Sequence, residues 1–359
     1  MIKTKLGLTQ TKINLGRQIE LDVAKALAVL FMVLVHVQMT FSNSKLEESN
    51  LGTVVDFLGG IPAAPIFMML MGIGFAYSKS SHYKSFIKKG ISILILGYLL
   101  NTLREVIPEL IDYFYYQEEE ALENAIEGFI NIDILQFAGL TTILWGFVIK
   151  MKLNNYKILS ITLLFSFLNM ALLNFKFENY FLQATTGLLW GSSDISEFPF
   201  FTWIVYPIAG YYLAQFLLTC QNKSKFYKIL LISSTLLCSV FAYFILAIFK
   251  MDVGLDSEIT YYHHNLITNL LFTFFCIFWL SILYFLYKIL PNFIIKPIKR
   301  WSKNVTEIYF IHWILIGWIA WYFDEETNST AIYLSICVII FILSDFIAHL
   351  LNKNKIKLK

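Results

Sequence analysis

Apolar segments about as long as a bilayer is thick recur along the chain, separated by short polar stretches. A hydrocarbon core of about 30 Å requires roughly 20 apolar residues per helix, and these segments lack the polar and apolar alternation of barrel strands. The pattern predicts an all-α, polytopic integral membrane protein with about ten transmembrane helices. The predicted spans are Leu21–Phe41, Ile61–Tyr77, Phe86–Ile107, Ile130–Ile149, Tyr156–Leu173, Pro199–Leu218, Ile229–Phe249, Leu266–Tyr287, Val305–Phe323 and Ala331–Leu351.

Two further segments are predicted at the membrane surface. Tyr180–Trp190 is apolar but too short to span, which favours an interfacial or re-entrant segment. The longest gap, Pro108–Phe129, carries a run of glutamates and is predicted to contain a short acidic helix outside the membrane. Because no gap accommodates a soluble domain, we expect one transmembrane domain over 1–359, with an N-terminal cytoplasmic segment at 1–20 and a basic tail at 352–359.

Composition and charge support this class and predict an orientation. Hydrophobic residues make up 57% and charged residues 15% of the chain, whereas soluble domains are about a quarter charged. Of the 28 lysines and arginines, 23 fall on alternate segments that share a side with the N-terminus. Since basic residues accumulate in the cytoplasm, both termini are expected there. The richness in lysine, asparagine and isoleucine is typical of a bacterium with an AT-rich genome, so the expected location is the bacterial plasma membrane. The net charge of +3 reflects this asymmetry and gives no support to nucleic-acid binding. The expected contacts of the spans are with membrane lipids.

The cysteines predict neither a metal site nor a disulfide framework. All four lie in or beside apolar spans, without the paired spacing of a zinc site. No metal cofactor is therefore expected.

Ionisable side chains inside a span cost about 2.5–3.5 kcal/mol each on insertion scales, and the first span holds the densest set. Asp22 and Lys25 are three residues apart, hence neighbours on one helix face and able to pair. His36 follows Lys25 by eleven residues, so both project from nearly the same side, about 16 Å apart. His36 is either a polar anchor or a general base. Lys25 is either a donor-binding cation or a lysine that snorkels to the interface beside Asp22.

Other ionisable residues give weaker signals. His312 lies about two turns into the ninth predicted span. Asp345 and His349 are four residues apart on the last span, which predicts a pair along one helix. His263 and His264 fall in a polar outer segment and are predicted to form solvated surface.

Five short motifs, in order along the chain, resemble those of polytopic membrane acyltransferases. The chain resembles the acyltransferase-3 family, and still more the bacterial proteins grouped with heparan-α-glucosaminide N-acetyltransferase. The motifs are Arg17…Asp22-Val23-Ala24-Lys25…His36, Ala63–Phe67…Gly72, Asp133–Gly139, Phe198–Trp203…Gly210 and Asn304…Tyr309–Trp313.

The resemblance implies transfer of an acyl group, usually acetyl, from cytoplasmic acyl-CoA to a hydroxyl or amine of a cell-surface or lipid-linked glycan. The acyltransferase-3 signature is an arginine and a histidine separated by ten residues. Lys25 takes the arginine's place and His36 matches the histidine. Lysine keeps the charge but loses the bidentate fork, so its contact with a donor phosphate is less directional. The glucosaminide branch has its proposed catalytic histidine in the first outer loop, where Ser42–Leu51 contains none.

Acyl transfer requires a base for the acceptor proton, a stabiliser for the tetrahedral oxyanion and a place for the polyanionic donor. His36 is predicted to be the base, with His312 or Tyr309 assisting. The predicted catalytic residues are His36, Lys25, Asp22 and His312. The residues predicted to contact the phosphates of acetyl-CoA are Lys25, Lys296, Lys299, Arg300 and Lys303, although a positive-inside bias alone would also place a basic cluster there.

Two other functions stay open from the sequence. A secondary transporter or exporter of a glycan or lipid-linked substrate would line its path with Lys25, His36, Asp133 and Asp345. Against it, the sequence shows no inverted repeat and no paired broken helices. A catalytically silent membrane scaffold is the third possibility. Release of free thiol from acetyl-CoA by the purified protein would distinguish an acyltransferase from a transporter and from a silent scaffold.

The charge distribution yields a testable topology. Single cysteines introduced into a variant without the four native cysteines should react with an impermeant thiol reagent on intact cells only at outer positions. We expect labelling at Lys45, Glu120 and Asn328, and none at Lys84, Lys223 and Lys355. Labelling of Lys223→Cys without labelling of Asn328→Cys would reverse the orientation.

Overall fold

The computed structural model describes residues 8, 9, 11–80, 82–173, 175–191, 195–248, 250, 261–323 and 326–354. The outermost parts of the two predicted terminal segments, 1–7 and 355–359, lie outside these residues, and the labelling position Lys355 lies there with them.

Helices make up the described part of the chain, joined by turns and isolated bridges, which confirms the predicted all-α class. The helices of the first half are α2 (Ile19–Phe41), α3 (Ser44–Glu47), α4 (Asn50–Gly59), α5 (Ala64–Tyr77), α6 (Tyr83–Asn101), η1 (Thr102–Val106), α7 (Ile107–Ile111), η2 (Asp112–Tyr116), α8 (Glu120–Ile130), α9 (Ile134–Lys150) and α10 (Asn155–Leu172). The others are α11 (Tyr180–Gly187), α12 (Phe200–Trp203), α13 (Val205–Thr219), α14 (Lys223–Tyr243), η3 (Phe244–Ile248), α16 (Leu266–Leu286), η4 (Tyr287–Ile289), α17 (Asn292–Lys303), α18 (Val305–Phe323) and α19 (Thr330–Lys353).

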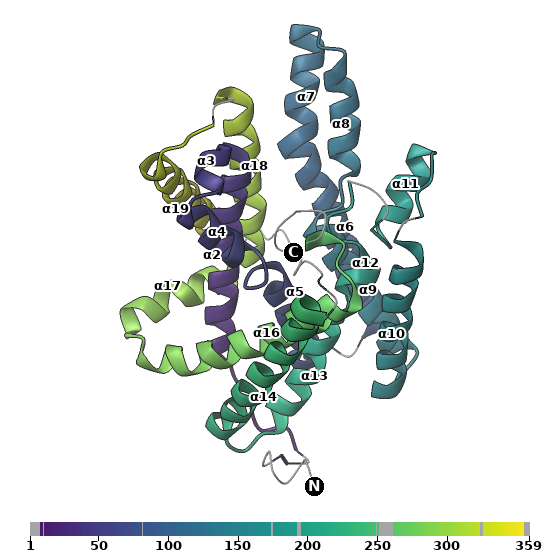
Figure 1. Cartoon of the computed structure of the whole chain (residues 1–359), viewed down its shortest axis with the longest axis vertical. Coiled ribbons are helices and arrows are strands. Elements are labelled where there is room, and N and C mark those ends of the chain that lie inside the picture. Colours follow the sequence, from purple (N-terminus) through teal and green to yellow (C-terminus); the bar gives the residue numbers. More distant parts are fainter. Residues whose placement is uncertain are drawn as a thin grey trace.

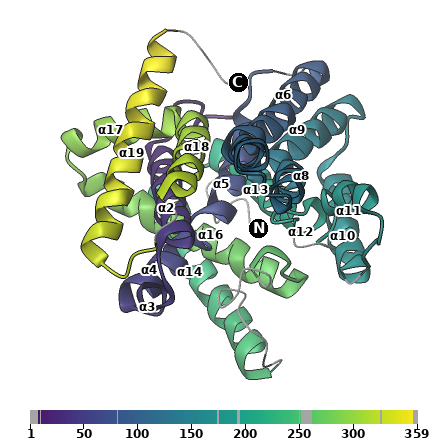
Figure 2. The ribbon, with the colours of Figure 1, turned by 90° about the horizontal axis from the view of Figure 1, so that it is seen from above.

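Ten helical segments within the described residues correspond to the ten predicted spans. Nine are long and apolar enough to cross a membrane, and α9 is a shorter apolar helix. α2 and the α4–α5 segment are largely buried, whereas α14 exposes most of its surface, as expected for a helix that faces lipid. Seen from above, α2 and α5 lie centrally, with α6 and α9 on one side and α17 and α19 on the other (Figure 2). The protein is therefore a multi-pass membrane protein.

The third span is a helix longer than a hydrocarbon core is thick. The predicted loop at Pro108 is wrong, because the helix that begins with α6 continues through η1, α7 and η2 to Tyr116. At 34 residues it is about 50 Å long, longer than a hydrocarbon core of about 30 Å. With α8, which confirms the predicted acidic helix, it forms a hairpin that projects at the top of Figure 1, opposite the N-terminus. We call these two sides the hairpin side and the N-terminal side.

A π-helical turn explains how the helix passes Pro108. Proline has no backbone N–H to donate, and its ring clashes with the carbonyl group four residues earlier, which belongs to Arg104. The wider turn η1 covers that position, as is common where an α-helix accommodates an irregularity. It also leaves the Leu103 carbonyl oxygen to accept a hydrogen bond from Trp318 Nε1 at 2.9 Å. The irregularity therefore ties the third span to α18.

The close crossing of α5 and α13 depends on two glycines. A Cβ atom added to Gly72 would lie 1.7 Å from the Pro207 carbonyl oxygen, and one added to Gly210 would lie 1.9 Å from the Met69 carbonyl oxygen. Small residues permit this approach of two backbones within a membrane. Gly74, one half-turn along α5, has no atom within 4 Å of the equivalent position.

We expect Gly72→Ala to destabilise the protein and Gly74→Ala to leave it stable. The extra methyl group at position 72 meets backbone atoms, which cannot rotate away. We therefore expect overpacking to lower the free energy of unfolding by at least about 1–3 kcal/mol. At position 74 the methyl enters open space, and alanine favours the helix by up to about 1 kcal/mol. Thermal unfolding of the two variants in detergent measures the difference. Equal midpoints for Gly72→Ala and Gly74→Ala would contradict the proposed role of the crossing.

Candidate active site

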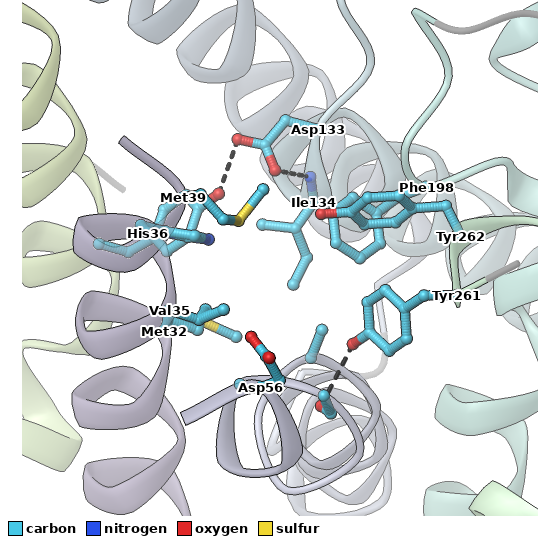
Figure 3. Close-up of a pocket in the computed structure, with 14 residues that line it drawn as sticks. Met32, Val35, His36, Met39, Asp56, Asp133, Ile134, Phe198, Tyr261 and Tyr262 are labelled. Carbon is cyan, nitrogen blue, oxygen red and sulfur yellow. Dashed lines mark hydrogen bonds between the residues drawn. The ribbon is translucent and has the colours of Figure 1, made fainter. Parts of the chain in front are cut away.

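A cavity of about 120 Å³ opens among the helices on the hairpin side. α2 contributes one wall, α4 and the start of α9 contribute others, and an aromatic wall stands opposite α2 (Figure 3). His36 lies at its edge, with a ring nitrogen directed into the space. We call this the hairpin-side cavity.

The His36 and His312 rings form a hydrogen bond that fixes where their protons lie. His312 Nδ1 is 3.1 Å from the Ile308 carbonyl oxygen, which can only accept, so this nitrogen carries a hydrogen. In the neutral His312 ring, Nε2 then holds a lone pair. It lies 2.8 Å from His36 Nδ1, which must therefore donate. The remaining nitrogen of His36, Nε2, is left with a lone pair, as a general base requires.

Aromatic contacts hold the His36 ring in this orientation. Its centroid lies 4.0 Å from that of Trp313 in a stacked arrangement, and 5.1 Å from that of His312. Trp313 is fixed in turn, because its Nε1 donates to the Tyr309 hydroxyl at 2.9 Å. Tyr309 donates to Asp133 Oδ2 at 2.7 Å. His36 is consequently held by side chains of α18 on one face and at one edge.

Asp133 connects this cluster to a buried arginine. Its Oδ1 accepts from the Ile134 backbone N–H at 2.5 Å and caps α9, while Oδ2 lies 3.5 Å from Arg104 Nη1. Arg104 Nε also lies 2.6 Å from Glu105, and its guanidinium covers the Trp313 ring at 4.2 Å. A buried cation without such partners would be strongly destabilising. Arg104 lies near the end of the third predicted span, in η1, and the packing of η1 against α18 brings it to the site.

A carboxyl group just outside the spans completes the charge balance. Glu197 Oε1 accepts from Asn131 Nδ2 at 3.4 Å. Burial, and then the negative charge of Asp133, raise the pKa of Glu197 to about 8. It is therefore protonated at neutral pH and adds no charge next to Asp133.

The aromatic wall of the cavity is positioned by a buried histidine. Tyr261 and Tyr262 line the cavity just before α16. His264 Nδ1 lies 2.7 Å from the Tyr261 carbonyl oxygen, its Nε2 lies 2.6 Å from the Tyr206 hydroxyl, and Trp203 Nε1 donates to the Tyr262 carbonyl oxygen at 2.9 Å. The prediction that His264 forms solvated surface is wrong, because these partners replace water and leave it 4% exposed. Burial lowers the pKa of His264 to about 4, so it is neutral at pH 7.

A second cavity, of about 250 Å³, lies on the N-terminal side of the first and is lined by Lys25 and Lys89 among apolar residues. The two cavities lie end to end along α2. Ile134 lines the first and the next residue, Leu135, lines the second. We call this the N-side cavity. The predicted geometry, in which Lys25 and His36 face the interior from one helix at two depths, thus corresponds to two adjacent cavities.

Asp22 lies at the N-terminal end of α2, away from His36. Its Oδ2 accepts from Arg17 Nε at 2.5 Å and its Oδ1 accepts from the Ser302 hydroxyl at 2.7 Å. Fourteen residues of helix separate Asp22 from His36, or about 21 Å. In this position Asp22 ties α2 to α17.

The predicted basic cluster lies on α17, outside the lining of the N-side cavity. Arg300 donates from Nε to Asp345 Oδ1 at 3.1 Å and makes a second contact with Asp345 Oδ2. The predicted pair of Asp345 with His349 is therefore wrong: the guanidinium fork offers two donors to the carboxylate, and His349 is exposed. The lysines of the cluster, Lys296, Lys299 and Lys303, are exposed or half-buried, and their contact with a donor stays a prediction.

Sequence reasoning missed three residues that shape the hairpin-side cavity. Neither Asp56 nor Arg104 stands out along the sequence, and Trp313 is named only as part of a motif. The available signal was that an ionisable residue within an apolar segment is expensive. That signal applies to Arg104, which lies inside the third predicted span, but it does not say which residues meet.

The fold and this site define a multi-pass membrane protein in which a histidine with a free lone pair lines one of two adjacent cavities. The family model of acyltransferase-3 proteins, described as an acyltransferase domain, matches residues 18–349. The chain therefore belongs to the acyltransferase-3 family and is a membrane acyltransferase. The likeness to the heparan-α-glucosaminide group stays a resemblance. No curated protein matches the chain.

Proposed function

We propose that the protein transfers an acetyl group from cytoplasmic acetyl-CoA to a hydroxyl or amine of a glycan on the outer face of the bacterial plasma membrane. The observation that carries the proposal is the lone pair on His36 Nε2 at the edge of the hairpin-side cavity, together with the adjacent N-side cavity, which two lysines line. In this orientation the N-terminal side is cytoplasmic and the hairpin side is outside.

The acceptor would occupy the hairpin-side cavity and the donor the N-side cavity. Lys25 and Lys89 would meet phosphates of the donor, and its extended arm would bring the thioester towards His36. Along α2 the distance from Lys25 to His36 is about 16 Å. The apolar residues that line the N-side cavity suit the uncharged part of the donor.

The reaction would proceed by proton transfer from the acceptor to His36. His36 Nε2 takes the proton of the acceptor hydroxyl while its oxygen attacks the thioester carbonyl carbon, giving a tetrahedral oxyanion. The carbon–sulfur bond then breaks, the thiolate takes the proton from His36, and the acetyl ester and free CoA leave. His312 accepts from His36 Nδ1 throughout and stabilises the imidazolium. The Tyr309 hydroxyl is engaged with Asp133 and Trp313, which favours a positioning role.

We expect His36→Gln to lower thiol release from acetyl-CoA, per folded molecule, by 10²–10⁴, the range for loss of a positioned base. His312→Leu should also reduce turnover strongly, because it removes the acceptor that fixes the His36 proton. His312→Gln should retain more activity, since its amide oxygen can still accept from His36 Nδ1. Glu48→Gln, an exposed change away from the cavity, serves as the control.

The folded fraction of each variant is measured by size-exclusion chromatography before the assay. Loss of a structural hydrogen bond alone costs about 0.5–1.5 kcal/mol of stability and leaves folded molecules active. Near-normal turnover of folded His36→Gln, together with loss of turnover in His312→Gln, would show that the base is on α18 and not on α2. Near-normal turnover of both would refute the proposed mechanism.

Lys25 yields a separate prediction about the donor. Lys25→Met should weaken acetyl-CoA binding by about tenfold or more, the equivalent of one charged hydrogen bond of about 1.5–3 kcal/mol. Lys25→Arg should preserve or improve it, because the guanidinium offers a bidentate contact. Lys228→Met, an exposed change at the start of α14, controls for loss of charge. Unchanged affinity in Lys25→Met, measured by calorimetry in detergent, would show that Lys25 only anchors α2 at the interface.

A further inference from the structure

Apart from His36, the described residues that line the hairpin-side cavity present carboxylates and no basic side chain. Asp56 and Asp133 supply the two carboxylates, and among the described residues that line the cavity there is no lysine or arginine. Asp133 is compensated from behind by Arg104 and by the Tyr309 hydroxyl. The negative charge that a ligand would meet therefore comes mainly from Asp56.

Asp56 has no cationic partner in the described part of the chain. It lies on α4 and remains exposed to the cavity. Its Oδ1 accepts from Gln38 Nε2 at 2.6 Å, and Gln38, which is 2% exposed, lies two residues beyond His36 on α2. The amide orients the carboxylate without neutralising it. Figure 3 shows this carboxylate projecting into the space between α2 and the aromatic wall.

The surroundings of Asp56 suit the two kinds of surface that a sugar ring offers. A carboxylate accepts hydrogen bonds from hydroxyl groups, whereas Phe198, Tyr261 and Tyr262 present aromatic surface to apolar C–H groups. An anionic ligand would be repelled, because a like charge close to Asp56 is unfavourable in a site with little water.

We infer that Asp56 determines acceptor specificity: the cavity takes the hydroxyl of an uncharged sugar and rejects acceptors that carry a carboxylate or phosphate near the reacting group. This inference rests on the proposed acetyl transfer. It also favours hydroxyl over amine acceptors. An amine between the Asp56 and Asp133 carboxylates would be held as an ammonium ion, which has no lone pair with which to attack the thioester.

The test compares three matched acceptors that differ in one group. Purified full-length protein in detergent is given acetyl-CoA with methyl β-D-glucopyranoside, methyl β-D-glucuronide or methyl β-D-glucosaminide, and thiol release above the acceptor-free rate is followed. We expect the glucoside to be used at least about tenfold better than the glucuronide, in kcat/KM, and better than the glucosaminide. Asp56→Asn should reduce the ratio of kcat/KM between the glucoside and the glucuronide by about tenfold, through a lower KM for the glucuronide. Glu48→Gln, which removes an exposed acid outside the cavity, should leave it unchanged.

An extract of envelope glycans serves as a fourth acceptor and separates the two proposals. Absence of thiol release with this extract contradicts the proposed function. If the extract supports thiol release, three results with the defined acceptors overturn only the role of Asp56. These are equal use of the glucoside and the glucuronide, preference for the charged sugars, and use of none of the three. An unchanged preference in folded Asp56→Asn also overturns it.

Discussion

The hydrogen bond between His36 and His312 fixes the chemistry of the site. Because His312 donates to the Ile308 carbonyl oxygen, it can only accept from His36 when neutral, and His36 Nε2 is left as a base. This assignment requires α18 to stay in register with α2. The stacking of Trp313 on His36 joins α18 to α2, the contact of Trp313 with Tyr309 fixes the indole, and the hydrogen bond from Trp318 ties α18 to the third span.

Charge is distributed so that His36, the proposed base, lies among groups whose charges balance. Arg104 is buried, but Asp133 and Glu105 lie against it, and Glu197 nearby is protonated. The same arrangement keeps the cation behind the wall of the hairpin-side cavity instead of in it. In the N-side cavity the lysines line the space directly. The two cavities thus differ in the charge that they offer, as the two substrates of an acyl transfer from a polyanionic donor would require.

The irregular parts of the fold place the functional groups. The π-helical turn at Pro108 ties the third span to α18 while Arg104 faces Trp313. The close crossing at Gly72 and Gly210 brings α5, which lines both cavities, against α13. The buried His264 holds the short segment that carries the aromatic wall. Each irregularity lies beside the cavities, where regular helices alone would not bring these side chains together.

The sequence by itself determined the class of the protein, the positions of its ten spans and the two ionisable residues of the first span, Lys25 and His36, that line the two cavities. The physical reason is that apolar length and local helical spacing are properties of one segment, and both can be counted along the chain. The tertiary structure decided which residues meet across helices: His36 with His312, Asp133 with Arg104 and Tyr309, and Asp345 with Arg300 instead of His349. These contacts join residues between 29 and 276 positions apart, and their geometry depends on how whole helices pack, which no local pattern records.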